Sequence, residues 1–350
     1  MSVAEQDDPG LPSEPERPPT PARGPGRAVT ETPELAIGTA RRTTSIDMTR
    51  PEGLAGPLVA DIRGRDLVRI DGHGAEVIDV IDLQVCIDRR TAQIASVTGS
   101  SSAEVGGLVG ISLRRGFGAA VIGALSVAAT RRALLFSALE DLNGAHLVAG
   151  YASLRAGLLV ASRQEGEARA AAQEDVCAGW ARGGAVVELL RRTGTNAVPL
   201  GPVAPPIAAP EGSWHDLAPL ALHTVRRLRC LDVRHADHGD VPSVRSHFRD
   251  SYQGADEEMV MHEYVVTTGI DPAGRAVRHL EVDPRVLPWE TCPAAAASAA
   301  ALDGTPFDEL PERVRSELVG PGTCTHLNST VRALADVRAL LGLLDVEYPA

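Results

Sequence analysis

The chain has 350 residues, of which 44% are apolar and only 3% aromatic, so a core must be built mainly from alanine, valine and leucine. At roughly 150 residues per domain, this length suggests two domains. The formal net charge of -12 argues against nucleic-acid binding, because an acidic surface repels phosphate backbones. No apolar run reaches the roughly 18 residues of a membrane span, and the N-terminus does not resemble a secretory signal. We therefore expect a cytoplasmic protein without membrane contact.

Two segments differ in composition from the rest of the chain. Residues 1–35 contain eight prolines and few large apolar side chains, which predicts a disordered, acidic tail. Residues 161–212 begin with a helical pattern and end in a proline-rich stretch, 198–212, that is typical of a stiff extended linker. These segments leave two units to fold, residues 36–160 and residues 213–350.

The two units share a series of landmarks in the same order, about 185 residues apart. The landmarks are Arg41, Arg42 and Asp47 with Arg226, Arg227 and Asp232; Arg65 and Asp66 with Arg249 and Asp250; residues 80–88 with 263–271; and His146 with His326. Recurrence of this kind predicts an internal duplication, in which the first unit is the degenerate copy.

In each unit the pattern predicts strands first and helices afterwards. Residues 80–88 and 92–97 form strands of the first unit, whereas 259–268 and 275–282 form a hairpin in the second. Helices are expected at 294–302 and 325–344. The fold class is therefore α+β: two tandem similar units, each a small antiparallel sheet with helices, which together form a pseudo-dimer. Homo-oligomerisation of the chain is left open.

Several features of the second unit form a recognisable series. They are Arg226-Arg227 with Asp232, His262 on a long strand, the step from Pro288 to Cys292, and Gly-Thr-Cys-Thr-His-Leu at 322–327. This series resembles the bacterial domain-of-unknown-function family 2889, from which the chain departs by the inserted Thr323 and by its second unit. The resemblance implies no settled activity. A hairpin, a cysteine at a helix start and Leu-Asp-Gly at 302–304 are also similar in order to the iron–sulfur scaffold fold.

Four side chains of the second unit could converge: His262, Cys292, Cys324 and His326. Two cysteines and two histidines are a common ligand set for zinc, and iron is the alternative metal. Both cysteines are expected at helix starts, where the helix dipole stabilises a thiolate. Without a metal, Cys324, His326 and His262 could act as nucleophile and acid–base groups. A purely structural role remains the third interpretation.

Two other groups of polar residues could bind a ligand. Arg226 and Arg227 could anchor an anionic ligand, although the recurring pair favours structural ion pairs with Asp47 and Asp232. A loop with Asp and His at 232–240 could bind a divalent metal or simply be solvated.

The leading hypothesis is an enzyme that acts on a small organic molecule, aromatic or acidic in character, through the site formed by these cysteines and histidines. A metal or iron–sulfur delivery protein is the second hypothesis, and a scaffold without chemistry is the third.

Overall fold

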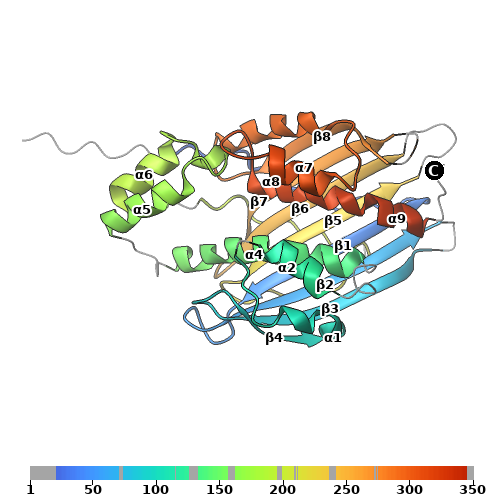
Figure 1. Cartoon of the computed structure of the whole chain (residues 1–350), viewed down its shortest axis with the longest axis horizontal. Helices are drawn as coiled ribbons and strands as arrows, with labels where there is room; N and C mark the ends of the chain where they lie inside the picture. Colours follow the sequence, from blue (N-terminus) through green and yellow to red (C-terminus); the bar gives the residue numbers. More distant parts are fainter. Residues whose placement is uncertain are drawn as a thin grey trace, which may run out of the picture.

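The computed structural model describes residues 21–70, 74–114, 116–125, 133–156, 162–194, 199–208, 210, 212–235, 242–271, 273 and 275–344. Within these ranges, eight strands form one antiparallel sheet in the order β4-β3-β2-β1-β5-β6-β7-β8 (Figure 1). The strands are β1 (Thr39–Thr49), β2 (Leu58–Arg69), β3 (Glu76–Ile87), β4 (Ile94–Gly99), β5 (Val225–Arg234), β6 (Ser243–Gln253), β7 (Glu258–Ile270) and β8 (Val277–Val286).

Most helices cover one face of this sheet, and α5 and α6 stand beyond one end of it (Figure 1). Those that follow β4 are α1 (Ser102–Val105), η1 (Gly106–Leu108), α2 (Phe117–Ala124) and α4 (Ala133–Arg155). The connector contains α5 (Arg163–Gln173), η2 (Ala178–Trp180) and α6 (Ala185–Thr193). Those that follow β8 are η3 (Cys292–Leu302), α7 (Leu310–Glu317), α8 (Thr325–Arg332), η4 (Ala333–Asp336) and α9 (Val337–Leu343). In the described part of the chain, no helix is both long enough and apolar enough to cross a membrane.

The mixed fold with antiparallel strands is confirmed, but the strands of both halves join into one continuous sheet. β1 and β5 would each be the edge of a four-stranded sheet if the halves were apart. Their pairing, with Arg41 opposite Asp232 and Asp47 opposite Arg226, satisfies backbone groups that an edge leaves exposed. The sheet therefore runs through the middle of the molecule without a break.

Ion pairs hold this central seam. The Nε atom of Arg41 lies 2.6 Å from Oδ1 of Asp232, and Nε of Arg226 lies 2.7 Å from Oδ1 of Asp47. The predicted structural pairing of these aspartates with the recurring arginines is therefore present, but each pair crosses from one half to the other. Almost every residue of β1 and β5 is buried, so these guanidinium groups need their carboxylate partners.

Two extended segments cover parts of the face opposite the helices. Residues 21–35, within the segment predicted to be disordered, include Val29, whose amide donates to Glu263 and whose carbonyl accepts from Arg249. Proline-rich backbone can be held in this way because polar anchors replace a hydrophobic core. Residues 1–20 of the predicted tail lie outside the described residues. The proline-rich linker is extended too, and the amide of Gly201 donates to the carbonyl of Val260.

The predicted helices of the second half differ in detail. Residues 294–302 belong to a 3-10 helix, η3, rather than an α-helix. Small alanine side chains tolerate its tighter turn, in which residues three apart eclipse each other. The predicted long helix 325–344 is divided into α8, η4 and α9. Two of the residues predicted to form the turn at 271–274 lie outside the described residues.

Candidate functional site

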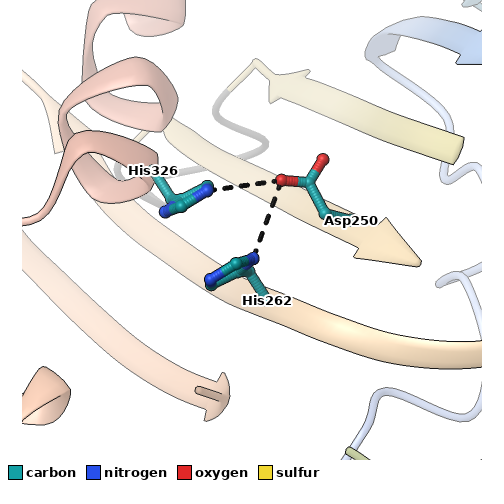
Figure 2. A group of neighbouring side chains, drawn as sticks. All are labelled: Asp250, His262 and His326. Carbon is teal, nitrogen blue, oxygen red and sulfur yellow. Dashed lines mark ion pairs between the residues drawn. The ribbon is translucent and has the colours of Figure 1, made fainter. Parts of the chain in front are cut away.

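Asp250, His262 and His326 converge on the helix-covered face of the second half (Figure 2). The register of β6 and β7 places Asp250 directly opposite His262, so both side chains leave the same face of the sheet. His326 comes from the first turn of α8, which begins directly after Cys324. The carboxylate Oδ2 of Asp250 lies 3.9 Å from Nδ1 of His262 and 3.6 Å from Nε2 of His326.

The two imidazole rings are stacked. Their centroids are 3.7 Å apart and their planes differ by 16°. Burial lowers the pKa of His262 to about 4, although the charge of Asp250 opposes this effect. Burial also lowers the pKa of His326 well below its usual value, and the neighbouring His262 adds to that shift. Both rings are therefore neutral at pH 7, and each has one nitrogen lone pair available to accept a proton or bind a metal.

A chain of buried ion pairs holds Asp250 in place. Arg227 donates two hydrogen bonds to the Asp250 carboxylate, of 2.8 and 2.9 Å, and its Nη1 lies 3.7 Å from Asp141 of α4. Arg229 donates to both Asp141 oxygens at 2.8 Å. Burial alone would raise the pKa of Asp141, but Arg229 and Arg227 lower it to about 2. The site thus rests on a carboxylate from the first half of the chain.

The stacked histidines line a pocket of about 470 Å³. Its walls come from α4, the segment around η2, the turn after β8, and the start of α8. The lining includes Leu147, Val148, Gly150, Tyr151, Leu154, Val176, Cys177, Trp180, Leu190, Met261, His262, Leu287, Trp289, Cys292, Cys324 and His326. Most of these side chains are apolar. Arg169 and Gln173 of α5 also line the pocket, so its polar groups are the two imidazoles together with these two side chains.

The predicted cysteines lie beside the histidines. Cys324 is in contact with the other nitrogen of His326, with Sγ 3.8 Å from Nδ1. Burial raises the pKa of the Cys324 thiol, and it raises that of Cys292 to about 12. The expected stabilisation of a thiolate at a helix start is therefore outweighed by desolvation, and both groups are thiols at pH 7.

The sequence did not point to two residues of this region. Asp250 appeared only as part of a repeated Arg-Asp landmark. That landmark gave no indication that Asp250 contacts His326. Cys177, from the connector, lies near Cys292: a Cβ atom added to Gly179 would lie 2.9 Å from Sγ of Cys292 and 3.9 Å from Sγ of Cys177. Burial raises the pKa of Cys177 to about 11.

The structure brings together some of the predicted ligands and places others elsewhere. The ligand atoms of Asp250, His262 and His326 all lie within 4.8 Å of one another, and no other such group occurs among the residues described in the ranges above. Cys292 and Cys324 line the same pocket but do not belong to this group. Arg226 and Arg227 are buried in ion pairs, and neither lines the pocket.

Only the first residues of the Asp and His loop predicted as another metal site, up to His235, are described. Asp232 is the partner of Arg41, and residues 236–241 lie outside the described residues.

The part of the chain from β5 into α9 matches a known family model. Residues 224–340 match the family model "Protein of unknown function (DUF2889)". This match confirms the resemblance predicted for the second half, and it contains Asp250, His262 and His326. No curated protein and no solved structure matches the chain.

Proposed function

We propose that the chain is an enzyme that binds a small organic molecule in this pocket and acts on it through His326 and His262. One observation carries the proposal: two neutral, stacked imidazoles contact a buried carboxylate and line a largely apolar pocket. Perturbed titratable groups in a pocket are typical of catalytic sites. His326 is the better acid–base candidate, because its Nε2 lies closer to Asp250 than Nδ1 of His262 does.

The lining favours a ligand with an apolar, flat body. Tyr151, Trp180 and Trp289 contribute aromatic surface to the pocket, in a chain with only 3% aromatic residues. Aromatic side chains stack on planar ligands and add about 0.5–1.5 kcal/mol per pair beyond the area they bury. A small aromatic acid fits both this surface and the polar groups of the pocket. A thiol nucleophile is disfavoured, because burial keeps Cys292 and Cys324 protonated.

Two other functions were predicted and are less well supported. An iron–sulfur or metal delivery protein would present thiolates near the surface, whereas Cys292 and Cys324 are only 7% and 6% exposed. A scaffold without chemistry would have no need of stacked, desolvated imidazoles. Burial of Nδ1 of His262 without a hydrogen bond to any described residue costs stability.

The experiment titrates the full chain with a panel of small aromatic carboxylic acids and their esters, and follows tryptophan fluorescence. Trp180 and Trp289 line the pocket, whereas Trp214 donates to Thr32 elsewhere and gives a constant background. Product formation is measured by mass spectrometry. We expect saturable quenching by at least one acid, and turnover that His326→Gln abolishes without preventing binding.

A matched pair of variants tests whether binding occurs in this pocket. Gly150 and Gly123 both lie on helices and a Cβ atom at either would meet nothing within 4 Å, but only Gly150 lines the pocket. Gly150→Leu should weaken binding at least tenfold and Gly123→Leu should leave it unchanged. Both should gain about 1 kcal/mol of stability from helix propensity. Equal affinities in the two variants would place the ligand elsewhere, and binding without turnover would favour the scaffold.

We also infer that the two halves arose by duplication, because their arginines make equivalent contacts. Each of two arginines pairs with the second strand of its own half and with a helix of the other half. They are Arg42 with Asp66 and Asp336, and Arg227 with Asp250 and Asp141. This equivalence aligns Asp141 with Asp336. It replaces the predicted match of His146 with His326, because His146 lies in the middle of α4 and His326 in the first turn of α8.

A further inference from the structure

We propose that Asp250, His262 and His326 bind one divalent transition-metal ion, with a coordination position open to the pocket. This inference rests on the proposed function, because the ion would be bound by the same two histidines that act on the pocket ligand. It differs from the ligand set expected from the sequence, since Asp250 replaces Cys292 and Cys324. Two histidines and one carboxylate are a set used by zinc and by non-haem iron.

The separations between the three groups carry the argument (Figure 2). Distances of 3.6 and 3.9 Å from Asp250 Oδ2 to the two imidazole nitrogens are too long for hydrogen bonds. They are close to the spacing of ligands around an ion, since metal–ligand bonds of about 2.0–2.2 Å in a tetrahedron separate neighbouring ligand atoms by about 3.3–3.6 Å. The ligand atoms of all three side chains lie within 4.8 Å of one another, so shorter separations and a tilt of the two stacked rings toward each other would bring the three atoms to one ion.

One of these atoms has no other partner. Nδ1 of His262 is buried, and it makes no hydrogen bond with any residue in the described ranges. A buried polar atom without a partner costs about 1–3 kcal/mol, so its retention calls for a ligand. The nitrogen is directed toward the Asp250 carboxylate, at the position where the ion would be held.

The neighbours of the three ligands are arranged as outer partners of a metal site. Arg227 fixes the plane of the Asp250 carboxylate through two hydrogen bonds. Cys324 Sγ contacts Nδ1 of His326, on the side of the ring away from Asp250. Binding a metal through Nε2 places the ring proton on Nδ1, which can then donate a hydrogen bond to Sγ of Cys324. Contacts of this kind orient metal-bound histidines and typically change metal affinity by about 10–100-fold when lost.

The charge of the surroundings indicates what completes the coordination. Asp250 and Asp141 are matched by Arg227 and Arg229, so these four ionised groups sum to zero before an ion binds. A divalent cation adds positive charge that no described group of this cluster balances. An anionic oxygen on the pocket ligand, such as a carboxylate or a phenolate, would supply the compensating charge and occupy the open position.

The experiment is a cobalt titration of the full chain after removal of metals with a chelator. We expect one Co²⁺ per chain, visible d–d bands of nitrogen and oxygen ligation, and no thiolate-to-cobalt charge-transfer band. Metal analysis after addition of Zn²⁺ and dialysis should likewise give one ion per chain. His262→Gln, His326→Gln and Asp250→Asn should each abolish the bands. His279→Asn, which removes an exposed histidine, should leave them unchanged.

Two outcomes would overturn the proposal. One is the absence of stoichiometric Co²⁺ and Zn²⁺ binding. The other is a thiolate charge-transfer band that Cys324→Ser or Cys292→Ser removes, which would favour the ligand set of the sequence prediction. Because Asp250→Asn leaves Arg227 without its partner, the two glutamine variants decide the result if that protein does not fold. Thermal melting checks the fold of every variant.

The failure of this proposal is separable from failure of the proposed function. Fluorescence titration of the metal-free chain with the same aromatic acids reports pocket binding alone. If that binding is lost in Gly150→Leu but no metal binds, the pocket stands and His326 acts without an ion. If metal binds but no acid does, the metal site stands and the enzyme proposal falls. If both hold, Zn²⁺ should tighten binding of the acids but not of their esters.

Discussion

His215 gives the clearest quantitative prediction, because it is buried against the central seam of the sheet. The residue is 7% exposed, and its ring nitrogens lie 2.9 Å from the Thr43 hydroxyl and 2.8 Å from the Ser45 hydroxyl, both on β1. Burial lowers the pKa of His215 to about 3, and Arg65 is the next largest cause. Folded protein therefore keeps this ring neutral at pH values where the unfolded chain, with a pKa near 6.5, binds a proton.

The sign of the effect follows from proton uptake by the unfolded state. Stability is full above pH 6.5 and is lost as the pH falls from about 6.5 toward about 3. At pH 5 the unfolded state gains a factor of about 30, which corresponds to a loss of about 2 kcal/mol. His215→Gln lacks this titration. At pH 7.5 the variant should be less stable than the natural chain by about 2 kcal/mol, because it loses two hydrogen bonds.

Urea unfolding at pH 7.5, 6 and 5 measures the difference between the two proteins. We expect the difference to shrink by about 2 kcal/mol between pH 7.5 and pH 5. The other buried histidines titrate equally in both proteins, so they cancel. A difference that stays constant to within about 0.5 kcal/mol would show that the ring is already charged, or already solvated, in the folded chain.

Three further predictions concern the ion pairs and the thiols. Asp141→Asn should lower the free energy of unfolding, measured with urea, by about 3–5 kcal/mol. Glu140→Gln should lower it by less than about 1 kcal/mol, because it removes only a partly exposed partner of Arg315. Iodoacetamide at pH 8 should leave Cys292 unmodified in the folded chain and modify it in urea, as measured by mass spectrometry. With a pKa of about 12, Cys292 is a thiolate in only about one folded molecule in ten thousand at this pH. Isolated residues 213–350 should dimerise through β5, and a fragment with Arg229→Thr should dimerise more strongly, as measured by light scattering. In the whole chain Thr44 lies opposite Arg229, whereas in a dimer of the fragment two copies of Arg229 would lie opposite each other and repel. Equal dimerisation of the two fragments would contradict the duplication.

Local patterns in the sequence were enough to predict four of the described strands, β3, β4, β7 and β8, and part of the site. The hairpin of β7 and β8 follows from two β-rich runs around a proline-containing turn. Side chains alternate along a strand, so His262 and Tyr264 of β7 share one face. Both residues do lie beside the start of α8, where His262 stacks on His326 and Tyr264 neighbours Cys324.

The remaining features depend on contacts between distant segments. Asp250 meets His326 only because β6 lies beneath α8, and no local pattern reports that packing. The state of the cysteines was also beyond sequence reasoning, because a helix start favours a thiolate and burial opposes it. Only the packed structure shows that burial is the larger effect for Cys324.

The first half of the chain is part of the site rather than only a support for it. The family match covers the strand and helix residues that hold Asp250, His262 and His326, but α4 of the first half supplies Asp141 and the pocket residues Gly150 and Tyr151. Removing α4 would leave Arg227 and Arg229 with one carboxylate between them and open the pocket on one side. Selection on the first half can therefore act through the shape of the pocket and the charge of Arg227, even though none of the three converging side chains comes from it.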